Sequence, residues 1–390
     1  MRPVTIVANP APAYNEVAET NANSSLVDTD AHGVQTPVTY GQVNQRLQAL
    51  IDVWVTNGMQ TQYVNHATRR VWAPGQQQAD YDLYKDQLSS NYGNARGALV
   101  TAVGQYCSYC EIPVNSNLHV EHVLPKNSFP AQSLSWTNFL LACPSCNTTK
   151  GDNPAQWING AAMATPNAVA YLNDPANYLW PNRFWQALAN NSLLPYRLVL
   201  RWMDVVPATA RGYAAGDWVF GAVVTPVERN ALVASYRNGE MIVRNGRWAV
   251  PGPLIKSWRH FGVEVQPNPA ATAAQQLAVT MIIEMTKLNR IVANAENDSV
   301  DRRIELRTEA CFKALLFRDY LQTAYAADPV NLYPAVLAQA TACMVATGFW
   351  CAWVTVLSSL NNLQPVITQA IQGTAQATPG GGPGVRIWVV

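Results

Sequence analysis

Two Cys-x-x-Cys pairs constrain the fold of this 390-residue chain more than any other feature of its sequence. Cys107 and Cys110 form the first pair, and Cys143 and Cys146 form the second. Four thiolates arranged in this way are typical of a tetrahedral zinc site, and such a site contributes folding free energy directly. The sequence therefore predicts a small domain that closes around a structural Zn²⁺ ion, with residues 111–142 held as a loop.

The other cysteines, Cys311, Cys343 and Cys351, are isolated in apolar helical surroundings. An odd total of seven with this spacing argues against a secreted disulfide framework. The first residues lack a charged region followed by an apolar run, so no secretory signal is predicted. We expect a cytoplasmic protein.

Histidine is rare in this chain, with five residues, yet two of them lie inside the loop between the cysteine pairs. His119 and His122 flank Glu121 on a short β-prone run that ends at Pro125. From the cysteines alone, a structural zinc ribbon without catalysis is the favoured interpretation. Two histidines beside a carboxylate favour a chemical site instead.

The segment from Tyr106 to Pro154 resembles the HNH (ββα-metal) endonuclease superfamily. The pattern H-x-E-H-x-x-P-K begins at His119, and W-x-N-x-L-L-A-C-x-x-C-N-x-x-K-G begins at Trp136. More narrowly, the sequence of this segment resembles the HNH subunit of Septu-type and retron-associated anti-phage systems. Members of that group tend to have a late T-K-L-N-R helix, which here corresponds to residues 286–290.

The resemblance implies a role for each polar residue of the motif. His122 is the expected general base, and Asn138 is expected to brace the loop that presents it. Glu121 and Asn147 would hold Mg²⁺ or Mn²⁺ through oxygen atoms. The chain departs from the family in having Glu121 where Asp is commoner and Asn147 where many relatives have His, an HNN-type variant.

Three residues of the motif have alternative interpretations. On a regular strand, residues 119 and 121 face one side and residue 122 faces the other, so a metal pair of His119 with Glu121 stays open. His119 otherwise supports the site or packs structurally. Lys126 and Lys150 are candidates for phosphate contact, with a solvated surface lysine as an equal alternative.

We expect an α+β protein, mainly helical, with a central zinc-bound ββα-metal module and a small antiparallel β meander. The module itself should consist of strands at about 118–124 and 138–142 and a helix that begins near Pro144. The predicted regions are an extended N-terminal arm (1–39), N-terminal helices (40–105), the nuclease module (106–165), an aromatic and basic region with the meander (166–265), a C-terminal helical region (266–378) and a Gly-rich tail with a terminal β segment (379–390).

Local patterns supply the elements outside the module. Apolar residues at helical spacing predict helices over about 43–54 and 78–103, and a helical face is expected at Leu277, Met281, Met285 and Leu288. Two Asn-Gly pairs, at 238–239 and 245–246, separate the β-prone runs LVASYR, EMIVR and RWAV, which predicts a three-strand meander.

A net charge of +1 means that any nucleic acid must be held by a local patch. One candidate is the region in which arginines and lysines alternate with aromatic residues, although an ordinary half-buried sheet is slightly favoured there. The residues concerned are Arg197, Arg201, Arg211, Arg237, Arg244, Arg247, Lys256 and Arg259, with Tyr196, Trp202, Tyr213, Tyr236, Trp248 and Trp258.

The C-terminal region has no charged side chain between Asp328 and Arg386. A helix over 335–360 would be long enough to span a bilayer, but it is only moderately apolar. A buried core helix or a homo-oligomer interface is favoured over a membrane helix, so a membrane-associated toxin is a weak alternative.

The sequence thus predicts a metal-dependent HNH endonuclease that hydrolyses phosphodiester bonds of nucleic acid, with DNA favoured over RNA. The resemblance implies anti-phage defence, or a restriction or toxin effector, and an ABC-type ATPase or other defence subunit as partner. The alternative is a catalytically silent, zinc-organised module that binds nucleic acid or assembles with such an ATPase.

Overall fold

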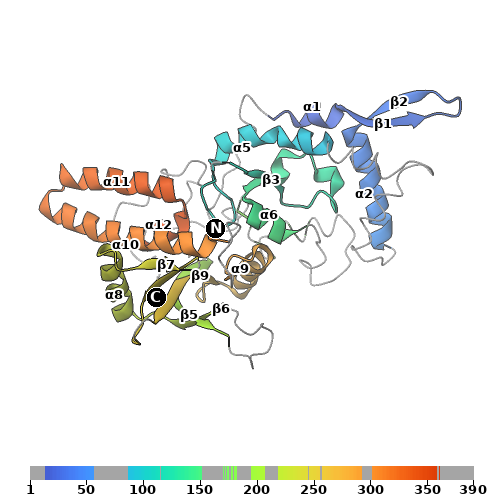
Figure 1. Ribbon diagram of the computed structural model, residues 1–390. Helices are drawn as coiled ribbons and strands as arrows, with labels where there is room; N and C mark the ends of the chain where they lie inside the picture. Colours follow the sequence, from blue (N-terminus) through green and yellow to red (C-terminus); the bar gives the residue numbers. More distant parts are fainter. Residues whose placement is uncertain are drawn as a thin grey trace.

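The computed structural model describes most of the chain between residues 14 and 360. Helices and antiparallel sheets alternate there in an α+β arrangement, with the cysteine-bearing segment between the N-terminal elements and a larger sheet covered by helices (Figure 1). The described residues are 14–56, 87–114, 116–151, scattered positions from 170 to 181, 195–206, 218–244, 246–254, 257–291, 301–357 and 360.

The N-terminal elements are α1 (Glu16–Asn21), β1 (Asn23–Thr29), β2 (Gln35–Thr39) and α2 (Tyr40–Thr56). The prediction of an extended arm is therefore wrong for residues 14–39, because β1 and β2 form an antiparallel hairpin. Asp30 closes it by accepting the backbone N–H groups of His32 and Val34. The polar sequence does not reveal this hairpin, because its buried apolar side chains, Leu26 and Val38, pack in a cluster with α2 and with Leu88 and Leu134, which lie far along the chain.

The helix predicted at 43–54 is confirmed by α2, in which Val43 and Leu47 are buried. The second predicted helix is interrupted: residues 87–93 are helical, a turn follows at Asn94, and α5 spans Ala95–Val103. Residues 78–86 of that prediction, with Tyr81 and Tyr84, lie outside the described residues.

The cysteine-bearing segment folds as two short strands and a short helix. β3 (His119–His122) pairs antiparallel with β4 (Phe139–Ala142), and α6 (Pro144–Lys150) follows directly. Pro144 occupies the first turn of α6, where a missing N–H costs nothing, and Gly151 ends the helix with a positive φ of 66°. Every residue of β4 is buried, because α5 covers one face of the hairpin and the cysteines lie on the other.

A five-stranded antiparallel sheet forms the core of the second half of the molecule. Its order is β6-β5-β9-β8-β7. The strands are β5 (Tyr196–Val205), β6 (Trp218–Val223), β7 (Ile242–Arg244), β8 (Arg247–Pro251) and β9 (Trp258–Pro267).

The predicted meander is partly wrong, because the run LVASYR lies in helix α8 (Pro226–Arg237). Thr225 and Glu228 form a capping box at its start, and this local signal outweighs the β propensity of the run. Gly239 (φ 71°) follows directly after that helix. The second predicted turn is confirmed, since Arg244 pairs with Arg247 across the β7–β8 hairpin.

The predicted C-terminal helices are present as α9 (Ala273–Thr286) and α10 (Arg303–Ala327). The helical face differs from the prediction, because Leu277 is exposed whereas Met285 and Leu288 are buried. The reason is that α9 packs against β9 through the neighbouring side chains of Ala278, Val279 and Ile282, all fully buried.

The uncharged region forms two helices rather than one, α11 (Leu332–Thr347) and α12 (Trp350–Leu357). Gly348 and Phe349 both have positive φ between them, and Glu111 accepts the backbone N–H groups of Phe349 and Cys351. None of the described helices is sufficiently long and apolar for a bilayer span. The Gly-rich tail, residues 379–390, lies outside the described residues.

Candidate functional site

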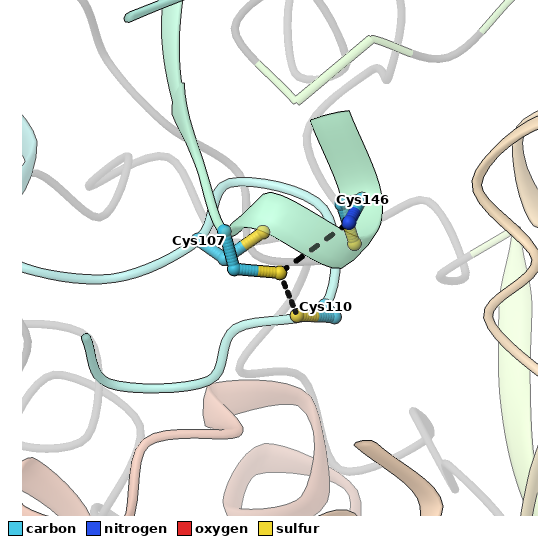
Figure 2. A group of neighbouring side chains, drawn as sticks. Cys107, Cys110 and Cys146 are labelled. Carbon is cyan, nitrogen blue, oxygen red and sulfur yellow. Dashed lines mark hydrogen bonds between the residues drawn. The ribbon is translucent and has the colours of Figure 1, made fainter. Parts of the chain in front are cut away.

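The four predicted cysteines converge on one buried point. Their Sγ atoms lie within 4.8 Å of one another, and the Sγ atoms of Cys110 and Cys143 are 3.7 Å apart. Tetrahedral zinc with thiolates at about 2.3 Å requires sulfur atoms roughly 3.8 Å apart. Figure 2 shows how Cys107 and Cys110 approach Cys146 from a separate turn of the chain. The donor set and spacing fit a structural Zn²⁺ ion.

An arginine that the sequence analysis missed links this cluster to distant helices. Arg303, at the start of α10, donates from Nη1 to Cys146 Sγ at 3.2 Å and to the carbonyl oxygen of Thr286 at 2.6 Å. Thr149 of α6 donates to the same carbonyl at 3.0 Å. The T-K-L-N-R segment therefore packs beside the cysteine cluster, but the prediction that it is a helix is wrong beyond Thr286, because Lys287 ends α9 in the left-handed conformation. The Arg303 guanidinium, which is also paired with Asp301, lies beside the thiolates with opposite charge. No local pattern could have identified Arg303.

The side chains of β3 alternate regularly between the two faces of the hairpin. His119 pairs with Ala142 and His122 with Phe139, without a bulge. His119 and Glu121 therefore face α6 and the cysteines, whereas His122 faces the other way. This alternation decides which of the predicted site residues lie together.

On the α6 face, the structure brings His119 to Asn147. The ring Nδ1 of His119 lies 3.0 Å from Nδ2 of the Asn147 amide, and both residues are half-buried. Rotation of the amide by a half-turn would present its oxygen to the same space. The pair combines an imidazole nitrogen with an amide oxygen, both of which are metal ligands.

Glu121 shares that face but contacts other groups. Its Oε1 lies 2.5 Å from Nζ of Lys150, and Tyr109 donates a longer hydrogen bond to the same oxygen at 3.4 Å. Burial raises the pKa of Glu121, and the charge of Lys150 opposes that shift. The structure thus places the predicted metal ligand Glu121 in a buried ion pair, apart from the contact between Asn147 and His119.

Lys150 is an interior residue, with its side chain only 2% exposed. Besides Glu121, its ammonium donates to the backbone carbonyl of His122 at 2.6 Å. It therefore connects α6 to the end of β3. The predicted phosphate contact would require this ammonium to leave both partners.

His122 lies on the opposite face and is 7% exposed. Its Nε2 is 2.8 Å from the carbonyl oxygen of Ser133, and its ring meets the edges of Tyr92 and Phe139. Because a carbonyl only accepts, Nε2 carries the proton and Nδ1 is left as a proton acceptor. Burial lowers the pKa of His122 to about 3, so the imidazole is neutral at pH 7.

Asn138 makes the contacts expected of a residue that braces a loop. Its Oδ1 accepts the backbone N–H of Leu124 at 2.7 Å, and its Nδ2 donates to the carbonyl oxygens of Leu124 and Gln132 at 3.0 and 2.9 Å. The two hydrogen bonds to Leu124 tie together the ends of the loop between β3 and β4, and the third holds its middle at Gln132. They also hold the chain directly after His122.

The N-terminal elements cover the loop on the His122 side. Asn44 of α2 donates to Ser133 Oγ at 2.9 Å, and Tyr14 donates to the carbonyl oxygen of Leu134 at 2.9 Å. Tyr92 lies on the imidazole ring, and its hydroxyl accepts a hydrogen bond from Lys126 at 2.8 Å. Tyr92 thus contacts both His122, the predicted base, and Lys126, the second predicted phosphate contact.

Comparison with known proteins agrees with the geometry. Residues 107–153 match the family model described as HNH endonuclease. This segment is an HNH-family domain. The resemblance inferred from the sequence is confirmed for it, and the HNH domain contains every predicted site residue.

A relative also matches beyond the bare motif. The chain is 33% identical over 75 residues to a Bacillus thuringiensis protein described as "Septu protein PtuB". The match covers 18% of this chain and 29% of the relative, so the chain spans under a third of the length of the protein it resembles. No solved structure matches the chain significantly.

Proposed function

We propose that the chain is a metal-dependent endonuclease that hydrolyses phosphodiester bonds of nucleic acid, with DNA favoured over RNA, in defence against phage. The family match and the partial likeness to a Septu protein support the class of activity. The observation that carries the proposal is that His119 and Glu121 share the face of β3 that packs against α6, where Asn147 of α6 contacts His119 and Glu121 is paired with Lys150. Such a set of nitrogen and oxygen donors suits a divalent cation.

In this proposal, Mg²⁺ or Mn²⁺ is held by Asn147 and Glu121, and His119 either joins them or positions the Asn147 amide. The cation supplies positive charge to the scissile phosphate when it is bound. Lys150 must release Glu121 for that carboxylate to become a ligand. The ammonium of Lys150 would then keep its hydrogen bond to the carbonyl of His122.

His122 is the proposed general base. The imidazole is neutral, and its Nε2 donates a hydrogen bond to the carbonyl of Ser133. Nδ1 is therefore the atom that would take a proton from water. Tyr92 covers that ring, so substrate must displace Tyr92 before the base can act. Lys126, released from the Tyr92 hydroxyl by the same movement, becomes free to contact a phosphate.

The test is a cleavage assay with the full chain and added Mg²⁺ or Mn²⁺, on plasmid, linear and single-stranded DNA and on RNA. We expect His122→Ala and Asn147→Ala each to lower the rate at least ~100-fold, because one supplies the base and the other a metal ligand. His32→Ala, an exposed histidine at the β1–β2 turn, is the matched control and should cut normally. Full activity of His122→Ala would assign the base to another residue, with His119 tested next.

The alternative function is a zinc-organised module that binds nucleic acid without cutting it. It predicts tight binding, no turnover with any divalent metal, and no change on Asn147→Ala. The likeness to a Septu protein leads us to propose an ATPase partner that activates the nuclease. Activity that appears only when such a partner is added would support activation and reject the silent module.

A further inference from the structure

The five-stranded sheet lies outside the HNH domain (Figure 1). One of its faces carries aromatic and cationic side chains. Residues directly paired across antiparallel strands point to the same face. The pairings of Val205 with Trp218 and of Met203 with His260 therefore place Trp218 and His260 on one face. Trp258 precedes His260 by two residues and shares that face, so the three rings lie on it together.

Two arginines belong to the same face. Ala249 pairs with His260, and Arg247, two residues before Ala249, pairs with Arg244 across the β7–β8 hairpin. The five residues Trp218, Arg244, Arg247, Trp258 and His260 are called the Trp218 face.

Rings and guanidinium groups of the Trp218 face lie against one another. The Arg247 guanidinium lies 4.2 Å from the centre of the Trp218 ring, and that of Arg244 lies 6.0 Å from the Trp258 ring. The edge of Trp218 meets His260, with ring centres 4.7 Å apart. Arg247 is itself buried, whereas Arg244 is exposed and Trp218 and Trp258 are half-buried. These three flat cationic and aromatic groups are therefore the ones available for further stacking.

A hollow opens beside these rings, with a volume of about 240 Å³. Trp218, Trp258 and His260 line it, together with the end of β5. His260 is buried, and within the described part of the chain its Nδ1 makes no hydrogen bond. Leaving a buried ring nitrogen without a partner costs free energy, so a ligand that offers a hydrogen-bond partner to Nδ1 would remove that cost.

The chemistry of the surface favours an anionic ligand with flat rings. Burial and the two arginine charges lower the pKa of His260 to about 4, so the positive charge at pH 7 comes from the arginines. Phosphates neutralise arginines, and unpaired bases stack on tryptophan and arginine planes. A duplex offers phosphates as well, but its bases are already stacked within it.

We propose that the Trp218 face binds single-stranded nucleic acid, with bases stacked on Trp218 and Trp258 and phosphates held by Arg244. The inference rests on the proposed nuclease function in one respect: it makes this face the place where substrate is held outside the HNH domain. Binding itself does not depend on cleavage, so the two proposals can fail separately.

The experiment measures binding of the full chain to fluorescein-labelled 20-mers by anisotropy, without added divalent cation. The probes are oligo-dT, oligo-rU and a mixed-sequence duplex. We expect the single strands to bind more tightly than the duplex, and Trp258→Leu to weaken their binding about 10-fold. Arg244→Ala should weaken binding and reduce its dependence on salt concentration. Trp218→Leu is a second variant in case Trp258→Leu lowers the melting temperature.

Two matched controls lie on exposed helical surface elsewhere. Tyr325→Leu removes an exposed aromatic ring from α10, and Arg46→Ala removes an exposed guanidinium from α2. Both should bind oligonucleotides as the unchanged chain does. Equal binding of duplex and single strand, or unchanged binding by Trp258→Leu and Trp218→Leu, would overturn the inference. If cleavage persisted in that case, the proposed nuclease function would stand without it.

A different pattern of results would support the binding face and reject the proposed nuclease function. A chain that never cuts nucleic acid, but loses oligonucleotide binding on Trp258→Leu, would retain the inference and reject the nuclease. The two probes distinguish DNA from RNA as the strand that this face prefers.

Discussion

The predicted site residues of the HNH domain and His260 of the five-stranded sheet differ in their hydrogen-bond partners. In the HNH domain, Glu121 has Lys150, and His122 has the carbonyl of Ser133. On the sheet, His260 lies against a tryptophan ring and leaves its Nδ1 without a hydrogen bond among the described residues. A polar group with a hydrogen-bond partner in the folded chain is held in one orientation. His260, which lies beside the hollow, can instead form a hydrogen bond to a ligand.

The two regions also differ in what holds them together. β3 and β4 have four residues each, and the segment around them depends on the cysteine cluster. β5 and β9 have ten residues each and are packed by α9, α10 and α12. We therefore expect loss of the metal or of a buried polar pair to destabilise the HNH domain strongly. Changes within the sheet should have smaller effects on stability.

The largest effect should follow removal of one zinc ligand. Structural zinc binding contributes on the order of 10–16 kcal/mol in zinc-finger peptides, so Cys143→Ser should unfold the HNH domain and leave the sheet folded. Metal analysis should find no bound zinc, and hydrogen exchange should show unprotected amides in β3 and β4 but not in β5 and β9. Cys343→Ser, a half-buried cysteine of α11, is the control and should keep both zinc and protection. Equal loss of protection in both regions would mean that they fold as one unit.

The next effect should come from the buried ion pair. Lys150→Met leaves the Glu121 carboxylate buried without its counter-charge, and loss of one partner of such a pair costs about 3–5 kcal/mol of unfolding free energy. The double variant Glu121→Gln with Lys150→Met should recover much of this loss in denaturant titrations. Lys313→Met, in a partly exposed pair with Glu309, should change stability by less than about 0.5 kcal/mol. No recovery in the double variant would show that Lys150 acts mainly through the His122 carbonyl.

A smaller effect should follow loss of the loop brace. Asn138→Ala leaves buried backbone groups of Leu124 and Gln132 without partners, at a cost of about 3 kcal/mol or less. Chemical denaturation measures it, and Asn94→Ala, whose side chain is exposed, should stay within about 0.5 kcal/mol. If Asn138→Ala were as stable as the unchanged chain, the bracing role of Asn138 would be contradicted.

The smallest effect should be a pH dependence in the sheet. The pKa of His260 is lowered from 6.5 to about 4 in the folded chain, so the unfolded chain takes up its proton first as pH falls. Stability is thus lost progressively below pH 6.5 and down to about pH 4, with Arg244 and Arg247 adding repulsion. Melting curves at pH 7.5 and 4.5 should show a drop that is smaller by about 2–4 °C in His260→Gln. An identical drop in both chains would mean that this histidine does not titrate in that window.

Patterns of short range predicted much of the HNH domain. Each Cys-x-x-Cys pair and Pro144 at the start of a helix are signals of a few residues, as is Asn-Gly 245–246 at a hairpin of the sheet, and the structure confirms each. The convergence of the two cysteine pairs, by contrast, joins residues 33 apart in the chain. The run LVASYR was assigned wrongly although a local capping box marks the start of its helix, whereas two other wrong predictions involved partners far along the chain. The hairpin at 23–39 gains its burial from α2, and the uncharged C-terminal region breaks where Glu111 meets Phe349.

The sequence by itself determined the two cysteine pairs and the polar residues of the HNH motif, because the type and the spacing of potential ligands are properties of the chain. Only the tertiary structure decided how they are grouped: Asn147 with His119, Glu121 with Lys150, and His122 beneath Tyr92. The regular pleat of β3 divides the motif between two faces, and burial then requires each charge to find a partner. Partners such as Tyr92 and Arg303 come from distant segments, so no local pattern contains them.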